Sequence, residues 1–226
     1  MNKIFYFSGT NNTRLISEAI VEAFEGLGQD AECQAIDIYM KEGIEVQDDY
    51  GRLGIGFPVH AFSMPEIMED FLKRVPRGKG REAFVFHTAA GNGSYNYSGL
   101  VLARKMLKMK GYKVVYEKPF SMGSNFMMGF SDKVVKQLYM AGCMKAMTMV
   151  EDIVRGNREK VILNPIFREV VYALHPMEGK FGARIFGMFL KSDSSCSLCT
   201  KCVKACPTNN IAISDGKIIF GDKCMM

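Results

Sequence analysis

Apolar, strand-like segments alternate with helical patterns over the first 155 residues, and this alternation restricts the possible folds more than any other feature. The segments expected to form strands span residues 3–7, 31–38, 53–57, 83–87 and 113–116. Helical periodicity is seen in residues 13–27, 66–75, 97–110 and 131–155. Strands that alternate with helices favour a parallel sheet covered on both faces. Right-handed crossovers leave few topologies, so the sequence predicts an α/β domain.

Two helix starts carry polar residues of the type that caps a helix. Asn12 or Thr13 can cap the first helix, and Gly28 stands where a helix commonly ends. Ser63 and Glu66 have the spacing of a capping box, in which a hydroxyl and a carboxylate satisfy the first backbone N–H groups. We therefore expect Ser63 to cap the second helix.

Four cysteines near the C-terminus, Cys196, Cys199, Cys202 and Cys206, form the run Cys-x2-Cys-x2-Cys-x3-Cys, which Pro207 follows directly. This spacing resembles the iron–sulfur motif of bacterial ferredoxins, in which the fourth thiolate serves a second cluster. A zinc site usually takes its ligands as two separated pairs and fits this run poorly. The run predicts a [4Fe–4S] cluster.

Cys224 follows Cys206 after 17 intervening residues, about where a second ferredoxin motif is expected to begin. We expect Cys224 to be a metal ligand as well, and two clusters in the complete protein. Because the fourth cysteine of each motif serves the other cluster, Cys206 needs partners beyond Met226. The expectation is that the chain is a fragment; the alternative is a cluster completed in an unconventional way.

The composition is that of a soluble globular protein, with 48% hydrophobic and 23% charged residues. No apolar run reaches the ~18 residues of a membrane span, and the N-terminus lacks the features of a signal peptide. Seven cysteines, five of them in the tail, favour metal ligation in a reducing compartment, so a cytoplasmic protein is expected. The net charge of +5 comes without a dense Lys/Arg run, so we expect no nucleic-acid partner.

The turn after the first expected strand, Ser8 to Thr13, holds hydroxyls and amides directly before a helix. Backbone N–H groups at a helix start, at the positive end of the helix dipole, form a site for an anion. The turn contains neither a P-loop nor the Gly-x-Gly-x-x-Gly pattern of dinucleotide sites. A phosphate site and a helix cap without a ligand both remain open.

The loop from Ser8 to Thr13 resembles the phosphate loop of flavodoxins, and two later segments fit the same family. Phe57-Pro58-Val59-His60-Ala61-Phe62 follows the third expected strand, and Thr88-Ala89-Ala90-Gly91-Asn92-Gly93-Ser94-Tyr95 follows the fourth. The whole chain is similar to flavodoxins fused to a C-terminal two-cluster ferredoxin. The resemblance implies FMN as a cofactor, with contacts from Ser8, Gly9, Thr10, Asn11, Asn12, Thr13, Pro58, His60, Phe62, Ala90, Gly91, Asn92, Gly93 and Tyr95.

The resemblance also implies the architecture. It predicts a flavodoxin-like, doubly wound, five-stranded parallel sheet in the order 2-1-3-4-5, with a small C-terminal α+β ferredoxin-like module. Residues 1–155 would form the FMN-binding domain, residues 156–190 a connector, and residues 191–226 the iron–sulfur module. In such a sheet the ligand lies at the carboxyl ends of strands one, three and four, where the winding reverses.

Within the expected site, Tyr95 is the first candidate to stack on the flavin ring and Phe62 the second, with ordinary packing as the alternative for each. His60 could hydrogen-bond the ring or simply face solvent. The family has glycine where this chain has Asn11; asparagine tolerates left-handed backbone angles, although its side chain adds bulk beside the phosphate. His87 and His175 are expected to be structural, and Cys33 and Cys143 to be buried thiols.

Two functions fit these residues. The first is an electron carrier that relays electrons between FMN and [4Fe–4S] clusters and exchanges them with redox partner proteins. The second is an FMN-dependent oxidoreductase that reduces a quinone or a nitro compound at the flavin, with Tyr95, Tyr97 and Met127 lining its pocket. A protein that has lost its flavin and serves as a redox sensor or scaffold is a third class. The absence of an evident nucleophile in the sequence favours the carrier.

Overall fold

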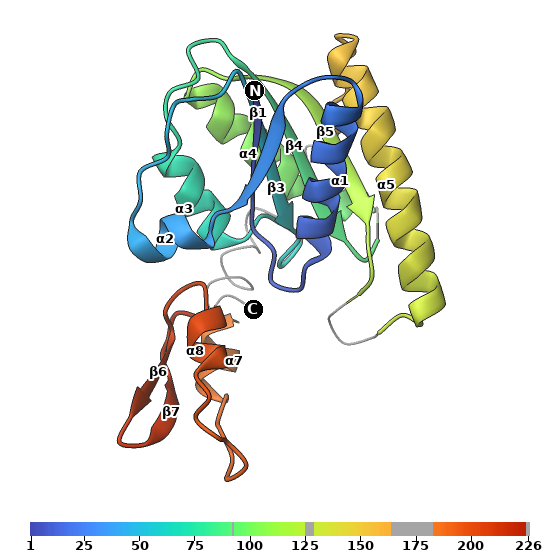
Figure 1. The fold of residues 1–226 in the computed structure, drawn as a ribbon. Coiled ribbons are helices and arrows are strands. Elements are labelled where there is room, and N and C mark those ends of the chain that lie inside the picture. Colours follow the sequence, from blue (N-terminus) through green and yellow to red (C-terminus); the bar gives the residue numbers. More distant parts are fainter. Residues whose placement is uncertain (92, 125–128, 164–182, 225–226) are drawn as a thin grey trace.

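The computed structural model describes residues 1–91, 93–124, 129–163 and 183–224, and its larger part is built on one sheet (Figure 1). The strands are β1 (Asn2–Tyr6), β2 (Ala31–Ala35), β3 (Arg52–Pro58), β4 (Glu82–Ala89) and β5 (Lys113–Ser121). They lie in the order β2-β1-β3-β4-β5, and every neighbouring pair is parallel. The winding reverses between β1 and β3. The expected α/β fold with flavodoxin-like, doubly wound topology is confirmed.

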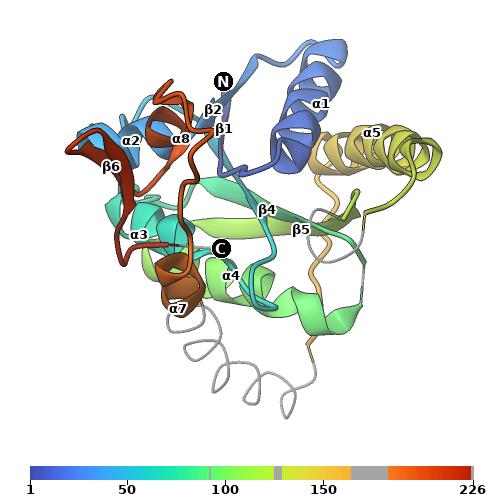
Figure 2. The same ribbon diagram turned by 90° about the horizontal axis from the view of Figure 1, so that it is seen from below.

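Helices cover both faces of this sheet (Figure 2). α1 (Asn12–Gly26) and α5 (Asp132–Val154) pack against each other on one face. α3 (Glu66–Arg74) and α4 (Ser98–Met109) cover the other face, and the short 3-10 helix η1 (Ser94–Tyr97) leads into α4. None of the described helices combines the length and the apolar character needed to cross a membrane.

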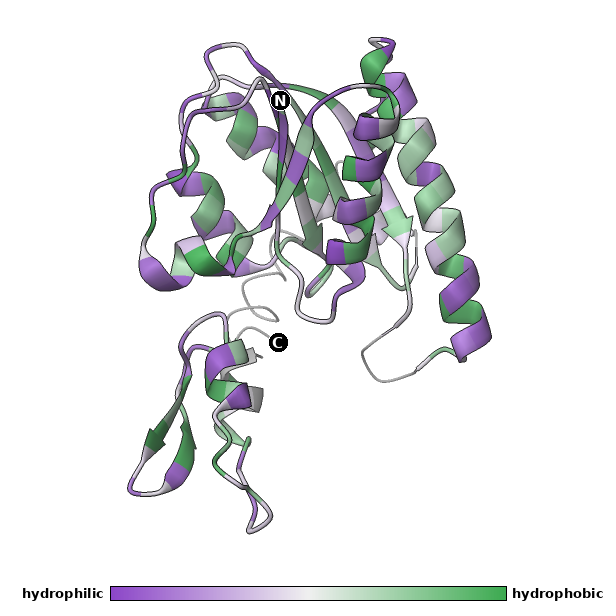
Figure 3. Ribbon diagram, in the orientation of Figure 1, coloured by the Kyte–Doolittle hydropathy of each residue, from purple (hydrophilic) through white to green (hydrophobic). Residues whose placement is uncertain are grey.

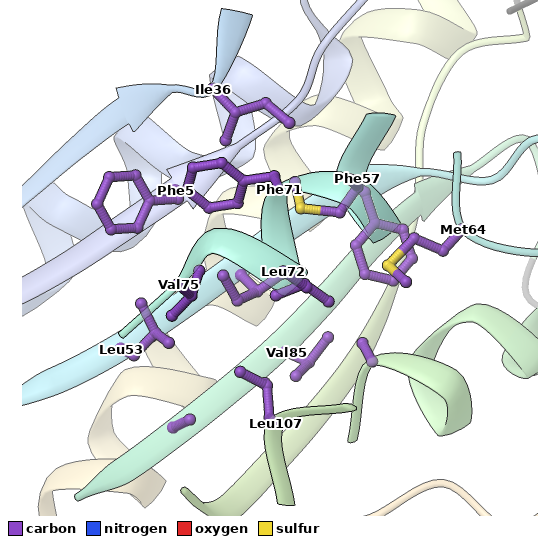
Figure 4. Close-up of a cluster of buried hydrophobic side chains, with 14 of the residues drawn as sticks. Phe5, Ile36, Leu53, Phe57, Met64, Phe71, Leu72, Val75, Val85 and Leu107 are labelled. Carbon is purple, nitrogen blue, oxygen red and sulfur yellow. The ribbon is translucent and has the colours of Figure 1, made fainter. Parts of the chain in front are cut away.

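The two faces of the sheet carry separate hydrophobic cores, because side chains alternate along each strand. Phe84 and Phe86 of β4 face α1 and α5, whereas Val85 faces α3 and α4. The core beneath α3 and α4 is shown in Figure 4, where Phe5 of β1 packs on Phe71 of α3 with ring centroids 5.1 Å apart. In Figure 3 the central strands are mainly hydrophobic, whereas the helices that flank the sheet alternate between hydrophobic and hydrophilic residues. Burial on both sides explains why the strand segments read as continuous apolar runs.

The second strand is shorter than the expected 31–38 and is followed by a helix that the sequence did not indicate. β2 ends at Ala35, and α2 (Asp37–Glu42) begins two residues later. Ile36 is buried and donates its N–H to the Tyr6 carbonyl at 2.9 Å, which anchors the turn between them. Gly43 ends α2 in the left-handed region, with φ of 70°. Six residues span less than two helical turns, too few for periodicity to reveal.

The expected capping role of Ser63 is wrong. α3 begins at Glu66, and Pro65, with φ of −61° and ψ of 143°, occupies the N-cap position without a side-chain cap bond. Ser63 instead belongs to the preceding loop, where its backbone pairs with His60. Its hydroxyl is buried and finds no hydrogen-bond partner among the described residues.

The first part of the expected connector packs against the exposed edge of the sheet. Glu117 of β5 donates its N–H to the Glu159 carbonyl at 2.8 Å, and Glu159 forms an isolated parallel bridge with Tyr116. The buried Glu117 carboxylate accepts hydrogen bonds from the Val161 N–H at 2.9 Å and from Arg104 Nη1 at 2.7 Å. Residues 157–163 thus cover the β5 edge that would otherwise be free to pair. Residues 164–182 of the connector lie outside the described residues.

The C-terminal part contains α7 (Ala183–Met188), α8 (Lys201–Ala205) and an antiparallel hairpin of β6 (Ile211–Ser214) and β7 (Lys217–Phe220). Asp215 and Gly216 form its two-residue turn with φ of 49° and 68°, the left-handed angles that favour an Asp-Gly turn. Figure 1 shows this part below the edge at which the parallel strands end. Lys41 of α2 donates from Nζ to the Lys204 carbonyl of α8 at 2.6 Å, a direct contact between the two parts.

Candidate functional site at the carboxyl edge of the sheet

Three loops meet at the carboxyl ends of β1, β3 and β4, where the winding of the sheet reverses. They contain residues 8–13, residues 59–63, and the described residues of 90–95, respectively. This is the position in an open parallel sheet where a ligand binds, because the loops diverge there and leave space between them. The strand assignment from the sequence placed the three loops correctly at this edge.

The first loop enters α1 through a residue in the left-handed conformation, which asparagine tolerates better than other non-glycine residues. Asn11 adopts φ of 70° and serves as the N-cap of α1, and its carbonyl accepts the Leu15 N–H at 3.0 Å. Ser8 Oγ accepts the Arg14 N–H at 3.3 Å, so one amide of the first turn already has a side-chain partner. Asn12 Nδ2 donates to the Gly123 carbonyl at 2.8 Å and ties the loop to the segment after β5. Gly9 and Asn11 are exposed, and a Cβ at Gly9 would meet open space.

The last residue of this loop is anchored to β4. Thr13 is 1% exposed, and its hydroxyl lies 2.8 Å from the hydroxyl of Thr88, which is 3% exposed. Ser17 donates its hydroxyl proton to the Thr13 carbonyl at 2.8 Å. The loop is therefore attached at its base, while its outer residues face solvent.

The second loop is a tight turn with an exposed aromatic side chain at its tip. His60 donates its N–H to the Ser63 carbonyl at 3.0 Å, and Ser63 donates back at 2.9 Å. Ala61 and Phe62 between them have φ of 46° and 61°, which non-glycine residues adopt at a cost of about 1 kcal/mol or more each. Ser98 of α4 donates its hydroxyl proton to the Phe62 carbonyl and holds the turn. Strain of this kind, kept by a specific contact, is characteristic of functional loops.

The third loop brings Tyr95 against the tip of the second. The Phe62 and Tyr95 rings are edge to face, with centroids 5.9 Å apart, and are 46% and 44% exposed. A Cβ on Gly93 would lie 2.0 Å from Tyr95 Cε1, so only glycine permits this position of the ring. The buried Asn96 donates from Nδ2 to the Gly91 carbonyl at 2.9 Å and fixes the start of the loop. Asn92 lies outside the described residues.

The chemical types of these residues suit the two ends of FMN, its phosphate and its ring system. The helix start at residues 8–13 offers hydroxyls and backbone N–H groups to a phosphate, and two exposed aromatic rings lie at the same edge for a flat ring system. A ring stacked between Phe62 and Tyr95 would need them about 7 Å apart, twice a carbon–carbon contact. The observed pair is closer than that. The rings must therefore separate for a sandwich, or the flavin stacks on the free face of one of them.

His87 and His60 differ in their surroundings. His87 is fully buried near the end of β4, and burial, with a smaller effect of Lys145, lowers its pKa to about 3. Neither of its nitrogens has a hydrogen-bond partner among the described residues. It packs between Phe57 and Tyr97, with ring centroids 6.3 and 6.2 Å away, and is neutral at physiological pH. His60 lies in the second loop and packs edge to face on Phe7, with centroids 6.2 Å apart.

The five tail cysteines are split between two environments. Cys196, Cys199 and Cys202 are exposed, and hydrogen bonds from the Lys201 N–H and the Ser197 side chain lower the pKa of the Cys199 thiol. For Cys206, burial raises the pKa, but hydrogen bonds from Thr208 and from the Asn210 N–H, at 3.2 Å from Sγ, outweigh it and lower the pKa overall. Among residues 1–91, 93–124, 129–163 and 183–224, no three His, Cys, Asp or Glu side chains gather with metal-binding geometry. The cluster ligands stay a prediction from the sequence.

A cavity of about 200 Å³ separates this part of the tail from the end of β1. Cys206 and Cys224 both line it, together with Pro207, Phe7 and Leu190. The two cysteines that the sequence assigned to different motifs thus line one cavity, and Phe7, directly before the first loop, lines it as well.

Three residues of the site were not assigned from the sequence. Thr88 lay within a segment that was recognised but had no role, and Asn96 and Ser98 had none either. Thr88 and Ser98 act through partners far away in the chain, Thr13 and Phe62, whereas Asn96 acts through Gly91, five residues before it. Only the hydroxyl or amide character of these side chains near a loop could have indicated such a role.

No protein-family model matches the chain, and no curated protein matches it. Several solved structures are similar. The two-electron reduced flavodoxin of Megasphaera elsdenii is 20% identical, with 64% of this chain and 99% of that one covered and a TM-score of 0.45. A flavodoxin, WrbA-like protein from Agrobacterium tumefaciens is 16% identical, with 69% and 98% covered and a TM-score of 0.47. General stress protein 14 of Treponema denticola, in complex with FMN, is 12% identical, with 67% and 98% covered and a TM-score of 0.45. The fold assignment itself rests on the strand order of this chain.

Proposed function

We propose that the protein is an electron carrier that holds FMN at the carboxyl edge of its sheet and iron–sulfur clusters in its C-terminal part. The observation that carries the proposal is the meeting of three features at the switch point. These are a helix N-terminus opened by the left-handed Asn11, a strained turn that exposes Phe62, and a glycine that admits Tyr95. A phosphate at the first and an aromatic ring at the other two are the two ends of a flavin mononucleotide.

The residues at 8–13 would bind the phosphate without a basic side chain. Their N–H groups lie at the positive end of the α1 dipole, and the hydroxyls of Ser8, Thr10 and Thr13 are close by in the chain. Pro58, His60, Ala90 and the amides near Gly91 would border the ring. When bound, FMN accepts two electrons and releases them one at a time. The role of the protein is to orient the ring and to keep one edge accessible to a partner.

In the tail, thiolates of Cys196, Cys199 and Cys202 would bind one [4Fe–4S] cluster, and Cys206 and Cys224 the other. This division is supported by the cavity that Cys206 and Cys224 both line. N–H···S bonds such as that from Asn210 stabilise negative charge on sulfur and so raise the potential of a cluster. Exposed thiols require a reducing compartment, and we place the protein in the cytoplasm with redox proteins as donor and acceptor.

The alternative, an FMN-dependent quinone or nitro-compound reductase, has one observation in its favour. Phe62 and Tyr95 are nearly half exposed, so a flat substrate has room to stack at the same edge. The two functions differ in what reduces the flavin. A carrier receives electrons from another redox protein, whereas a reductase of this kind commonly accepts hydride from a nicotinamide.

Anaerobic reduction of the reconstituted protein separates the two functions. We expect the flavin absorbance near its long-wavelength maximum to stay unchanged with NADH or NADPH and to bleach when a reduced low-potential ferredoxin is added. The matched control is free FMN under the same additions. Bleaching by NAD(P)H alone, followed by turnover of a quinone, would contradict the carrier and establish the reductase. A protein that shows iron–sulfur absorbance but takes up no FMN would belong to neither class.

A further inference from the structure

Thr88, near the end of β4, contacts the other two loops of the candidate site. Its hydroxyl lies 2.8 Å from that of Thr13 in the first loop. Its carbonyl accepts the Val59 N–H of the second loop at 3.0 Å. Because Thr88 also lies only two residues before the third loop, one residue sets the relative positions of all three. The first contact uses the side chain and the second uses only the backbone.

One of the two hydroxyl protons of Thr13 and Thr88 is not used in the hydrogen bond between them. Each threonine hydroxyl carries one proton and can accept through two lone pairs, so the contact between Thr13 and Thr88 consumes one of two protons. Both side chains are buried, and among the described residues neither hydroxyl has a second hydrogen-bond partner. A buried polar group without a partner costs about 1–3 kcal/mol, so a ligand that supplies an acceptor here is favoured.

The direction of the bond decides where that proton points. Thr13 is the second residue of α1, within the first turn whose N–H groups form the anion site. If Thr88 donates to Thr13, the Thr13 proton is left for an acceptor in the loop of residues 8–13. A phosphate oxygen is such an acceptor, and a chain of two hydroxyl donors polarises the terminal one. The opposite direction would leave the proton on Thr88, inside the sheet.

We propose that Thr88 is a positioning residue for the phosphate of FMN: through its hydroxyl it fixes Thr13 and directs the Thr13 proton to the phosphate. The proposal rests on the proposed binding of FMN. Because Thr88 holds the second loop by its backbone carbonyl alone, its side chain affects the phosphate end of the ligand and leaves the ring end unchanged. A purely structural role, as in an ordinary cross-strand threonine pair, would affect both ends.

The test compares FMN with riboflavin, which has the same ring and no phosphate. Thr88→Val removes the hydroxyl and keeps the shape, Thr88→Ser keeps the hydroxyl, and Thr148→Val on the exposed side of α5 is a matched control. Dissociation constants come from quenching of flavin fluorescence in the full chain. We expect Thr88→Val to weaken FMN about tenfold and riboflavin less than twofold, with Thr88→Ser and Thr148→Val close to the unchanged protein.

A double-variant cycle gives a second test of the proposal, and Thr13→Val alone remains measurable if Thr88→Val is unstable. Thr13→Val should weaken FMN at least as much, and adding Thr88→Val to it should change the affinity by less than about twofold, because Thr88 acts through Thr13. Equal losses for FMN and riboflavin, or additive losses in the double variant, would overturn the proposal. If the unchanged protein binds FMN and Thr88→Val binds it equally well, only this inference fails. If the unchanged protein binds no FMN, the proposed function fails with it.

Discussion

Relative to the unchanged protein, His87→Leu is expected to lose about 2 kcal/mol more stability at pH 6.5 than at pH 4.5. His87 is buried without a hydrogen-bond partner among the described residues, and burial lowers its pKa from 6.5 to about 3. Between these values the unfolded chain binds a proton that the native protein does not. The native state is therefore favoured as pH rises through this range, and the variant lacks that contribution. Leucine suits the apolar surroundings of Phe57 and Tyr97.

Glu117→Gln is expected to show the opposite pH dependence: its stability relative to the unchanged protein should rise between pH 4.5 and pH 6.5. Burial raises the pKa of Glu117 from 4.5 to about 7, although Arg104 and the Val161 N–H act in the other direction. Here the native protein holds a proton that the unfolded chain releases, so stability falls as pH rises from 4.5 to 7. Lys108 and Lys160 also lower this pKa. The variant should gain about 2 kcal/mol relative to the unchanged protein between pH 4.5 and 6.5.

Urea unfolding at pH 4.5, 5.5, 6.5 and 7.5 measures both differences, because each variant is compared with the unchanged protein at the same pH. Between pH 4.5 and 6.5 the two residues oppose each other, so the double variant should run parallel to the unchanged protein. A single-variant profile that stays parallel within about 0.5 kcal/mol would show that the residue concerned titrates normally in the fold. The Glu117→Gln variant also probes the packing of the connector on β5, because the Glu117 carboxylate accepts a hydrogen bond from the Val161 N–H.

The second large effect concerns the tail cysteines. In the full-length protein reconstituted anaerobically with iron and sulfide, Cys202→Ala is expected to remove about half of the iron and of the acid-labile sulfide. Cys206→Ala should remove the other half, and the double variant nearly all, because the spacing assigns the third and fourth cysteines to different clusters. Cys143→Ala, which alters a partly buried thiol in α5, is the control and should keep the full content.

Three outcomes would contradict this division of the ligands. Both single variants could remove all the iron, which would place the two cysteines on one cluster. Neither single variant could remove iron, which would show that the cysteine run does not bind metal. Bound zinc without sulfide would replace the cluster by a tetrahedral thiolate site.

Much of the fold followed from the sequence because parallel strands buried on both faces leave a plain signal. The five expected strand segments all form, and the loops after β1, β3 and β4 meet as expected. The failures have local causes. α2 is too short for periodicity. β5 continues beyond residue 116, through the polar Glu117 and Lys118 and through Pro119, because it is the last strand of the sheet, where proline is tolerated.

The candidate site was predictable only where residue type carries the chemistry. Asn11 in a turn indicated its own left-handed backbone conformation, and Gly93 marked a place where the ring of Tyr95 leaves no room for a Cβ. Thr88 and Ser98 did not, because a threonine or a serine acquires its role from a partner that the fold brings close. The strained pair of Ala61 and Phe62 also gave no signal, since both residues are ordinary in sequence and unusual only in φ.

Titration of the flavin-free protein with FMN and, separately, with riboflavin tests the central claim most directly. A phosphate held by the start of α1 predicts a dissociation constant for FMN below about 1 μM and binding of riboflavin weaker by about a hundredfold. Equal affinity for the two ligands, or an FMN dissociation constant well above 1 μM, would contradict a phosphate site at residues 8–13 and with it the proposed carrier.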